Sequence, residues 1–140
     1  MMITADFAGV PIGVGLSYDS YRKFFEAQQT EAAPAASVIV GEADRRRAAG
    51  FYPAGSTDAY IEYMELCRRV SDVLIPFRRT VFHGCAFIWR GRVVLLCAPS
   101  GTGKTTHYVR WKQLYGDEIQ ILNGDKPGLF ARQEGDVTVH

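Results

Sequence analysis

The chain has 140 residues, of which 47% are hydrophobic and 22% are charged, and this make-up is typical of one ordinary globular domain rather than a large multidomain protein. Sixteen Lys and Arg against fifteen Asp and Glu leave a formal net charge of +1, so no strong overall field draws the chain onto nucleic acid or an anionic membrane. Any anion that it binds must therefore be held by a local site.

Neither a membrane span nor a secretory signal is expected. The most hydrophobic stretch, residues 81–97, is interrupted by His83, Arg90 and Arg92, and it falls short of the ~20 apolar residues that a spanning helix needs. The N-terminus has no basic segment followed by an apolar one. We therefore expect a cytoplasmic protein whose partners include neither a membrane nor nucleic acid.

Residues 1–78 predict a small α+β region of unknown role, without a recognisable chemical motif. In chain order the patterns predict two short strands within residues 3–14, a helix over 19–29, a short strand over 37–40, a basic helical turn at Arg45, Arg46 and Arg47, and a long helix that begins near residues 56–58 and stops at Pro76. The arginine run is interpreted as a solvated face.

Three cysteines, Cys67, Cys85 and Cys97, form no C-x-x-C pair, and each has hydrophobic neighbours in the sequence. Cysteine in such a setting usually packs as a small apolar side chain. All three are therefore predicted to be buried free thiols.

Residues 79–140 have a different character. Strand-like runs over 80–88 and 93–97 are joined by so few residues that they must form an antiparallel hairpin. The patterns that follow are a helix over 104–115, a strand over 119–122 and a last hairpin of strands 128–132 and 137–140 around a turn at 133–136. Because the last strand stops at His140, we expect this segment to be incomplete at its C-terminus.

The loop after the second strand of the first hairpin carries the chemistry. It reads Ala98-Pro99-Ser100-Gly101-Thr102-Gly103-Lys104-Thr105-Thr106 and matches the Walker A pattern, with Ala98 in place of the first glycine. Gly101 and Gly103 let backbone N–H groups approach phosphate oxygens at the positive end of the helix dipole. Lys104 is then expected to reach the β- and γ-phosphates, and the Thr105 hydroxyl to bind Mg²⁺. Residues 99–106 are thus the predicted nucleotide-binding residues.

Two further residues are candidates for catalysis. Asp125 follows the strand after the loop helix, where a carboxylate would bind Mg²⁺ or accept a proton, although Asn-Gly-Asp-Lys-Pro-Gly is also a good turn sequence. His83 is expected in the strand that pairs with the loop strand, either as a catalytic residue or as a histidine of the core. Lys126 either touches phosphate or is a solvated turn residue.

These residues resemble a known family. His83-Gly84, the hairpin, the segment 100–106 and Asn123-Gly124-Asp125 are similar to the C-terminal domain of HPr kinase/phosphorylase and to its relative, ATP-dependent phosphoenolpyruvate carboxykinase. The resemblance covers residues 80–140 and implies a mixed α/β P-loop fold with the Walker strand in an antiparallel hairpin. It also implies ATP and Mg²⁺ as cofactors, and for His83 either a catalytic role, as in the kinase, or metal binding, as in the carboxykinase.

The resemblance leads to two hypotheses. In the first, the chain is an ATP-binding kinase that transfers a phosphoryl group to a protein or small-molecule acceptor, with Lys104, His83 and Asp125 as catalytic residues and Thr105 and Asp125 as metal ligands. Both families usually have adjacent acidic residues where this chain has Asn123-Gly124-Asp125-Lys126. In the second, the chain is therefore an inactive or split nucleotide-binding module that acts by binding a partner. A GTP-dependent switch or carboxykinase-like protein is a weaker alternative, and self-association is left open.

Overall fold

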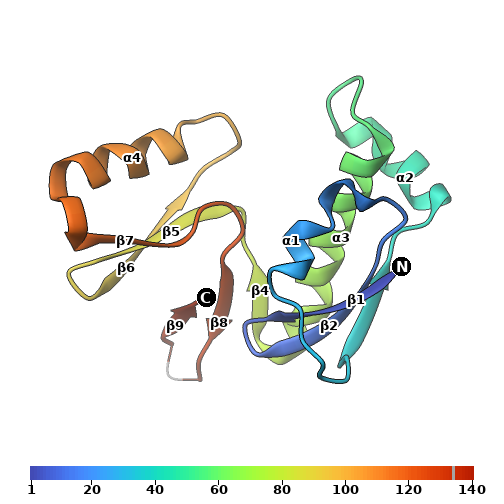
Figure 1. Cartoon of the computed structure of the whole chain (residues 1–140), viewed down its shortest axis with the longest axis horizontal. Coiled ribbons are helices and arrows are strands. Elements are labelled where there is room, and N and C mark those ends of the chain that lie inside the picture. The colour runs from blue at the N-terminus through green and yellow to red at the C-terminus, as the bar shows by residue number, and fades with distance from the viewer. Residues whose placement is uncertain (134) are drawn as a thin grey trace. The chain divides into compact units, whose positions relative to one another are not determined.

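The computed structural model describes residues 1–133 and 135–140 and belongs to the mixed α and β class, as the sequence indicates (Figure 1). The chain divides into two compact units, Met1–Phe77 and Arg78–His140, here called the N-terminal and C-terminal units. Glu134, in the turn expected at 133–136, lies outside the described residues. Within the part of the chain that the structure describes, no helix is both long and apolar enough to cross a bilayer.

The N-terminal unit contains one three-stranded sheet with the order β1-β2-β3. Strands β1 and β2 are antiparallel and are joined by a tight turn at Ala8 and Gly9, both at positive φ, whereas β2 and β3 are parallel. Its elements are β1 (Met2–Phe7), β2 (Val10–Gly15), η1 (Asp19–Tyr21), α1 (Lys23–Glu26), β3 (Ala36–Ile39), α2 (Glu42–Ala48), η2 (Ala49–Phe51), α3 (Asp58–Leu74) and η3 (Ile75–Phe77).

Helix α3 is the long helix expected from the sequence, and it packs on β2 and β3 (Figure 1). The Thr57 hydroxyl caps its first turn by accepting a 3.2 Å hydrogen bond from the backbone N–H of Tyr60. Residues at helical spacing are buried on the side that faces the sheet, among them Leu66, Val70 and Leu74. The hydrophobic core of this unit therefore lies between α3 and the sheet.

A buried acid–base pair fixes α3 to the rest of the unit. The carboxylate of Glu62, which is fully buried, accepts hydrogen bonds of 3.1 Å from the backbone N–H groups of Ser17 and Tyr18. The guanidinium of Arg45 lies 3.4 Å from the same carboxylate and donates to the Val40 carbonyl at 3.1 Å. The expectation that the arginine run is a solvated face is thus wrong for Arg45, because this residue compensates the buried charge of Glu62.

The helix expected over residues 19–29 is also corrected. Among the described residues of that stretch, the structure has η1 and the short α1, because the chain then bonds to β1 around an isolated bridge between Ala5 and Gln29: the Gln28 carbonyl accepts from the Asp6 N–H at 2.8 Å, and the Thr30 N–H donates to the Thr4 carbonyl at 2.9 Å. Tertiary pairing with the sheet therefore overrides the local helical pattern.

The C-terminal unit contains two three-stranded sheets, with the orders β6-β5-β7 and β4-β8-β9. The expected hairpin is confirmed, since β5 and β6 are antiparallel and are joined at Arg90 and Gly91, both at positive φ. The elements are β4 (Arg79–Val81), β5 (Gly84–Trp89), β6 (Arg92–Cys97), α4 (Lys104–Tyr115), η4 (Gly116–Glu118), β7 (Ile119–Asn123), β8 (Gly128–Ala131) and β9 (Val137–Val139).

The strand expected over residues 80–88 is divided in two. Strand β4 pairs with β8, whereas β5 pairs with β6 and β7, so the chain passes from one sheet to the other through Phe82 and His83. The N–H of Phe82 donates to the Pro127 carbonyl at 3.0 Å, and the N–H of Gly84 donates to the Asp125 carbonyl at 2.9 Å. His83 therefore lies in the link before β5, not inside a strand, and its side chain is exposed.

The three cysteines are free thiols, but only Cys85 is buried. Cys67 is half-buried on α3, and Cys97 is exposed at the end of β6. The expectation of three buried thiols is therefore wrong for Cys97, because it is the last residue of β6, an edge strand of its sheet.

We predict that Glu62→Gln lowers the free energy of unfolding by about 3 kcal/mol, because it leaves the buried Arg45 guanidinium without a compensating charge. The matched control is Glu42→Gln, which removes an exposed ion pair with Arg46 and should cost less than about 1 kcal/mol. Urea denaturation followed by far-UV circular dichroism measures both values. Equal losses in the two variants would contradict a stabilising role for the buried pair.

Candidate functional site

The carboxyl ends of β6 and β7 lie at one edge of their sheet. Gly84, the first residue of β5, is opposite Cys97, the last residue of β6, and Ala86 is opposite Asn123, the last residue of β7. Because β5 runs antiparallel to both strands, β6 and β7 run in the same direction. The loops that follow them therefore leave the sheet at the same edge, where His83 precedes β5.

The loop of residues 98–106 leaves β6 and opens α4, as the sequence predicts. Gly101 (φ 81°) and Gly103 (φ 92°) both adopt the left-handed conformation that favours glycine, and Gly103 is the residue at the N-terminus of α4. Among the described residues, none accepts a hydrogen bond from the N–H of Gly101, Thr102 or Gly103, and all three are exposed. The loop therefore presents backbone donors to solvent at the positive end of the helix dipole.

Lys104 lies against its own loop. Its Nζ donates to the carbonyls of Ala98 at 2.7 Å and Pro99 at 3.0 Å, and the Thr102 hydroxyl also donates to the Pro99 carbonyl, at 2.7 Å. Burial raises the pKa of the Cys85 thiol, and the Lys104 ammonium opposes this rise without overcoming it. The ammonium thus lies close enough to the start of β5 to interact electrostatically with Cys85 at this edge of the sheet.

The remaining polar side chains of the loop are exposed. Those of Ser100, Thr105 and Thr106 make no hydrogen bond to any other residue that the structure describes. Their hydroxyls are therefore available to a ligand or to water.

His83, Asp125 and Lys126 form a charged group beside this loop. The Nε2 of His83 lies 3.5 Å from one carboxylate oxygen of Asp125, and the Nζ of Lys126 lies 2.6 Å from the other. The amide oxygen of Asn123 accepts hydrogen bonds from the N–H groups of Asp125 and Lys126, at 3.0 and 2.9 Å. Together with the bond from the Gly84 N–H to the Asp125 carbonyl, this turn holds the carboxylate at the edge of the sheet.

The structure thus brings together His83 and Asp125, which the sequence indicated only separately. Among the described residues, no hydrogen bond joins the Thr105 hydroxyl to Asp125, the other expected metal ligand. Across residues 1–133 and 135–140, no group of three or more His, Cys, Asp or Glu side chains could hold a metal ion without another ligand.

Sequence reasoning overlooked the steric requirement at Gly84. A Cβ at this position would lie 2.9 Å from the Leu96 carbonyl oxygen and 3.2 Å from the Phe82 ring, so β5 and β6 approach each other there as only glycine allows. The sequence signal was the His-Gly pair itself. Gly84 sets the position of the preceding residue, His83.

An aromatic cluster holds α4 on the sheet. Trp111 of α4 contacts Phe87 and Trp89 of β5, with ring centroids 5.4 and 5.0 Å apart, and its Nε1 donates to the Nε2 of His107 at 2.8 Å. No residue of α4 is completely buried. The large rings therefore supply most of the contact that fixes the N-terminus of α4 at the site.

Comparison with protein-family models, with curated proteins and with solved structures found no match to this chain.

We predict that Gly84→Ala destabilises the C-terminal unit by about 1–3 kcal/mol, because the new methyl group meets a backbone carbonyl that cannot move away. The matched control is Gly124→Ala, because a Cβ there meets no atom within 4 Å and the residue is not at positive φ. Both tryptophans of the chain, Trp89 and Trp111, belong to this unit, so their fluorescence reports on its unfolding. A loss of stability at Gly84 no larger than that at Gly124 would refute the steric argument.

Proposed function

We propose that the C-terminal unit binds the phosphates of a nucleoside triphosphate, with ATP and Mg²⁺ as the expected pair, at the 98–106 loop. The observation that carries the proposal is the row of exposed N–H groups at Gly101, Thr102 and Gly103, directly before α4, for which the described part of the chain provides no acceptor. Backbone donors of this kind, together with the helix dipole, favour an anion. Such a local site is what an anion would require, because the net charge of +1 provides no general attraction for anions.

Lys104 and Thr105 extend the same site. The two loop carbonyls that accept from the Lys104 ammonium hold it within the loop, and phosphate oxygens would replace these acceptors with charged ones. The exposed hydroxyl of Thr105 is the group that would bind Mg²⁺, and the Mg²⁺ would neutralise charge on the phosphates. Both residues therefore fit the groups that the resemblance implies.

Phosphoryl transfer is the activity that we propose for this site. The oxygen of an acceptor hydroxyl would attack the γ-phosphorus while Asp125 accepts the proton of that hydroxyl. The bond between the γ-phosphorus and the β-phosphate oxygen would break, so that a nucleoside diphosphate leaves. His83, 3.5 Å from Asp125, would orient that carboxylate. The resemblance to HPr kinase supports these roles and supports ATP over GTP, with a protein or a small molecule as the acceptor.

One contact favours a second candidate function. The ammonium of Lys126 lies 2.6 Å from the Asp125 carboxylate, so the single acidic group at the end of β7 is already paired with a cation of the chain. No second carboxylate follows directly, because Lys126 takes that place in the sequence. The alternative is therefore a module that binds nucleotide without transferring phosphate and acts by binding a partner.

We predict that Mg²⁺-ATP raises the unfolding temperature of the native chain and that Lys104→Ala abolishes this rise, because the ammonium provides the main charged contact with the phosphates. Arg110→Ala is the matched control, since Arg110 is an exposed cation on the same helix. Differential scanning fluorimetry with ATP, GTP and Mg²⁺ alone measures the effect. An undiminished rise in Lys104→Ala would refute the proposed site.

We also predict that Asp125→Asn lowers Mg²⁺-dependent release of the γ-phosphoryl group, to water or to the protein itself, by about 100-fold or more, with little change in the ATP-induced thermal shift. Asp117→Asn, at a fully exposed carboxylate, should leave the rate unchanged. Radiolabelled γ-phosphate measures release and transfer in one experiment. Binding without turnover in the native chain would instead support the second candidate.

A further inference from the structure

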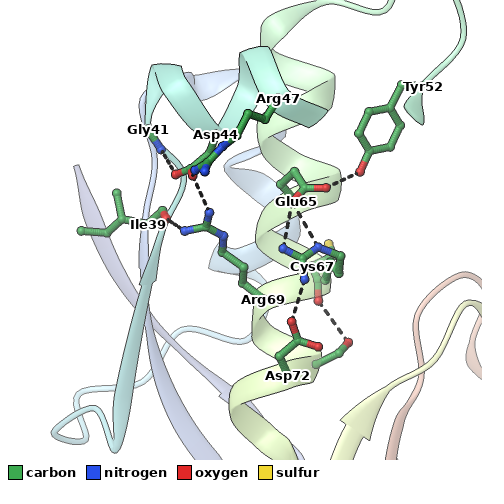
Figure 2. Close-up of polar contacts among 11 residues, drawn as sticks. Ile39, Gly41, Asp44, Arg47, Tyr52, Glu65, Cys67, Arg69 and Asp72 are labelled. Carbon is green, nitrogen blue, oxygen red and sulfur yellow. Dashed lines mark hydrogen bonds and ion pairs between the residues drawn. The ribbon is translucent and has the colours of Figure 1, made fainter. Parts of the chain in front are cut away.

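The N-terminal unit has an open pocket of about 490 Å³ that is separate from the 98–106 loop. It is lined by side chains of α2, of α3 and of the segment around Phe51 and Tyr52. Its volume lies within the ~300–1,000 Å³ that is typical of sites for small molecules. Figure 2 shows the polar side chains of α2 and α3 that surround it.

Two arginines are held in place around the carboxylate of Asp44 (Figure 2). Arg47 donates to Asp44 at 2.6 Å, and Arg69 lies 2.9 Å from the same oxygen while donating to the Ile39 carbonyl at 2.6 Å. The backbone N–H of Gly41 and then the Arg47 guanidinium lower the pKa of Asp44 to about 2. The carboxylate thus stays ionised at neutral pH and orients both guanidiniums.

A second charged group closes the other side of the pocket. The Tyr52 hydroxyl donates to Glu65 at 2.8 Å, and Arg68 donates to the other oxygen of Glu65 at 3.1 Å and to Asp72 at 2.7 Å. Burial and the bond to Glu65 raise the pKa of Tyr52 to about 12, so the hydroxyl keeps its proton at neutral pH. Glu65 is therefore satisfied on both oxygens by the protein itself.

Arg47 keeps free donors at the pocket. The lining carries the guanidiniums of Arg47, Arg68 and Arg69, and Arg68 is already paired with the carboxylates of Glu65 and Asp72. Of the donors on Arg47, only Nη2 bonds to a residue in the described part of the chain, and the side chain is 79% exposed. The planar guanidinium thus has free donors that can bind a carboxylate.

The rim of the pocket is apolar. Phe51 is 88% exposed, beside Tyr52 and near Ala48, so a large ring lies in water next to the guanidiniums. A ring left in this position offers apolar area to a ligand, at ~25 cal/mol per Å² buried. The pocket thus combines a guanidinium that has free donors with an exposed apolar ring.

We propose that this pocket binds a small organic anion with a single negative charge and a flat apolar body, of the chemical class of aromatic monocarboxylates. Its carboxylate pairs with the guanidinium of Arg47, which Asp44 orients, and its apolar body covers the ring of Phe51. The carboxylate of the ligand matches the free donors of Arg47, and its apolar body matches the exposed ring of Phe51. The proposal is independent of nucleotide binding in the C-terminal unit.

The test is a titration of the full chain with benzoate, followed by the NMR signals of the N-terminal unit, with benzamide as the uncharged ligand of the same shape. We expect saturable binding of benzoate, and binding of benzamide about tenfold weaker, because benzamide lacks the charge that strengthens its hydrogen bonds to arginine. Arg47→Gln should weaken benzoate binding about tenfold. Arg46→Gln, which changes the neighbouring and equally exposed arginine outside the pocket, should leave it unchanged.

Two further variants complete the test. Phe51→Ala removes an exposed ring and leaves the charges in place, so it should weaken benzoate binding several-fold in a folded chain. Lys104→Ala should have no effect, which separates this pocket from anion binding at the 98–106 loop. Equal affinity for benzoate and benzamide, equal losses in Arg47→Gln and Arg46→Gln, or no saturable binding of benzoate, phenylacetate or hexanoate would each overturn the proposal. Binding only of an acidic peptide would also overturn it.

Discussion

The antiparallel pairing of β5 with both β6 and β7 is the constraint on which the candidate nucleotide site depends. It makes β6 and β7 run in the same direction, so the loops after these strands leave the sheet at the edge where β5 begins. The close approach at Gly84 and the bond from its N–H to Asp125 then fix both the link before β5 and the turn after β7. Residues far apart in the sequence, such as His83 and Asp125, thereby lie side by side at one edge of the sheet.

The chemistry of this site depends on what its charges already contact. The N–H groups of Gly101, Thr102 and Gly103 have no acceptor among the described residues, whereas the ammonium of Lys104 and the carboxylate of Asp125 are each engaged by neighbouring groups. Under the proposed function, phosphate binding requires only that Lys104 exchange carbonyl oxygens for phosphate oxygens. The proposed proton transfer requires in addition that the Asp125 carboxylate act as a base beside the Lys126 ammonium. The proposed binding and the proposed turnover can therefore be tested separately.

Charge is used in two ways in the N-terminal unit. The pair of Glu62 and Arg45 is buried and bonded to backbone groups, so it serves the packing of α3. The pairs around Asp44 and Glu65 are open to solvent on one side and line a pocket. There the carboxylates orient guanidiniums that keep donors free, which is the arrangement that recognition of an anion requires. The exposure of the guanidiniums of Arg47 and Arg68 therefore distinguishes the pocket from the structural pair.

Local pattern alone determined the class of the fold, the long helix α3, the β5–β6 hairpin and the loop that opens α4, because helical periodicity, short turns and glycines act within a few residues. Only the tertiary structure decided that residues 28–30 pair with β1, that the run over 80–88 divides between two sheets, that Arg45 is buried and that His83 meets Asp125. These features depend on partners distant along the chain, whose hydrogen bonds and charges outweigh the local preferences that a sequence pattern records.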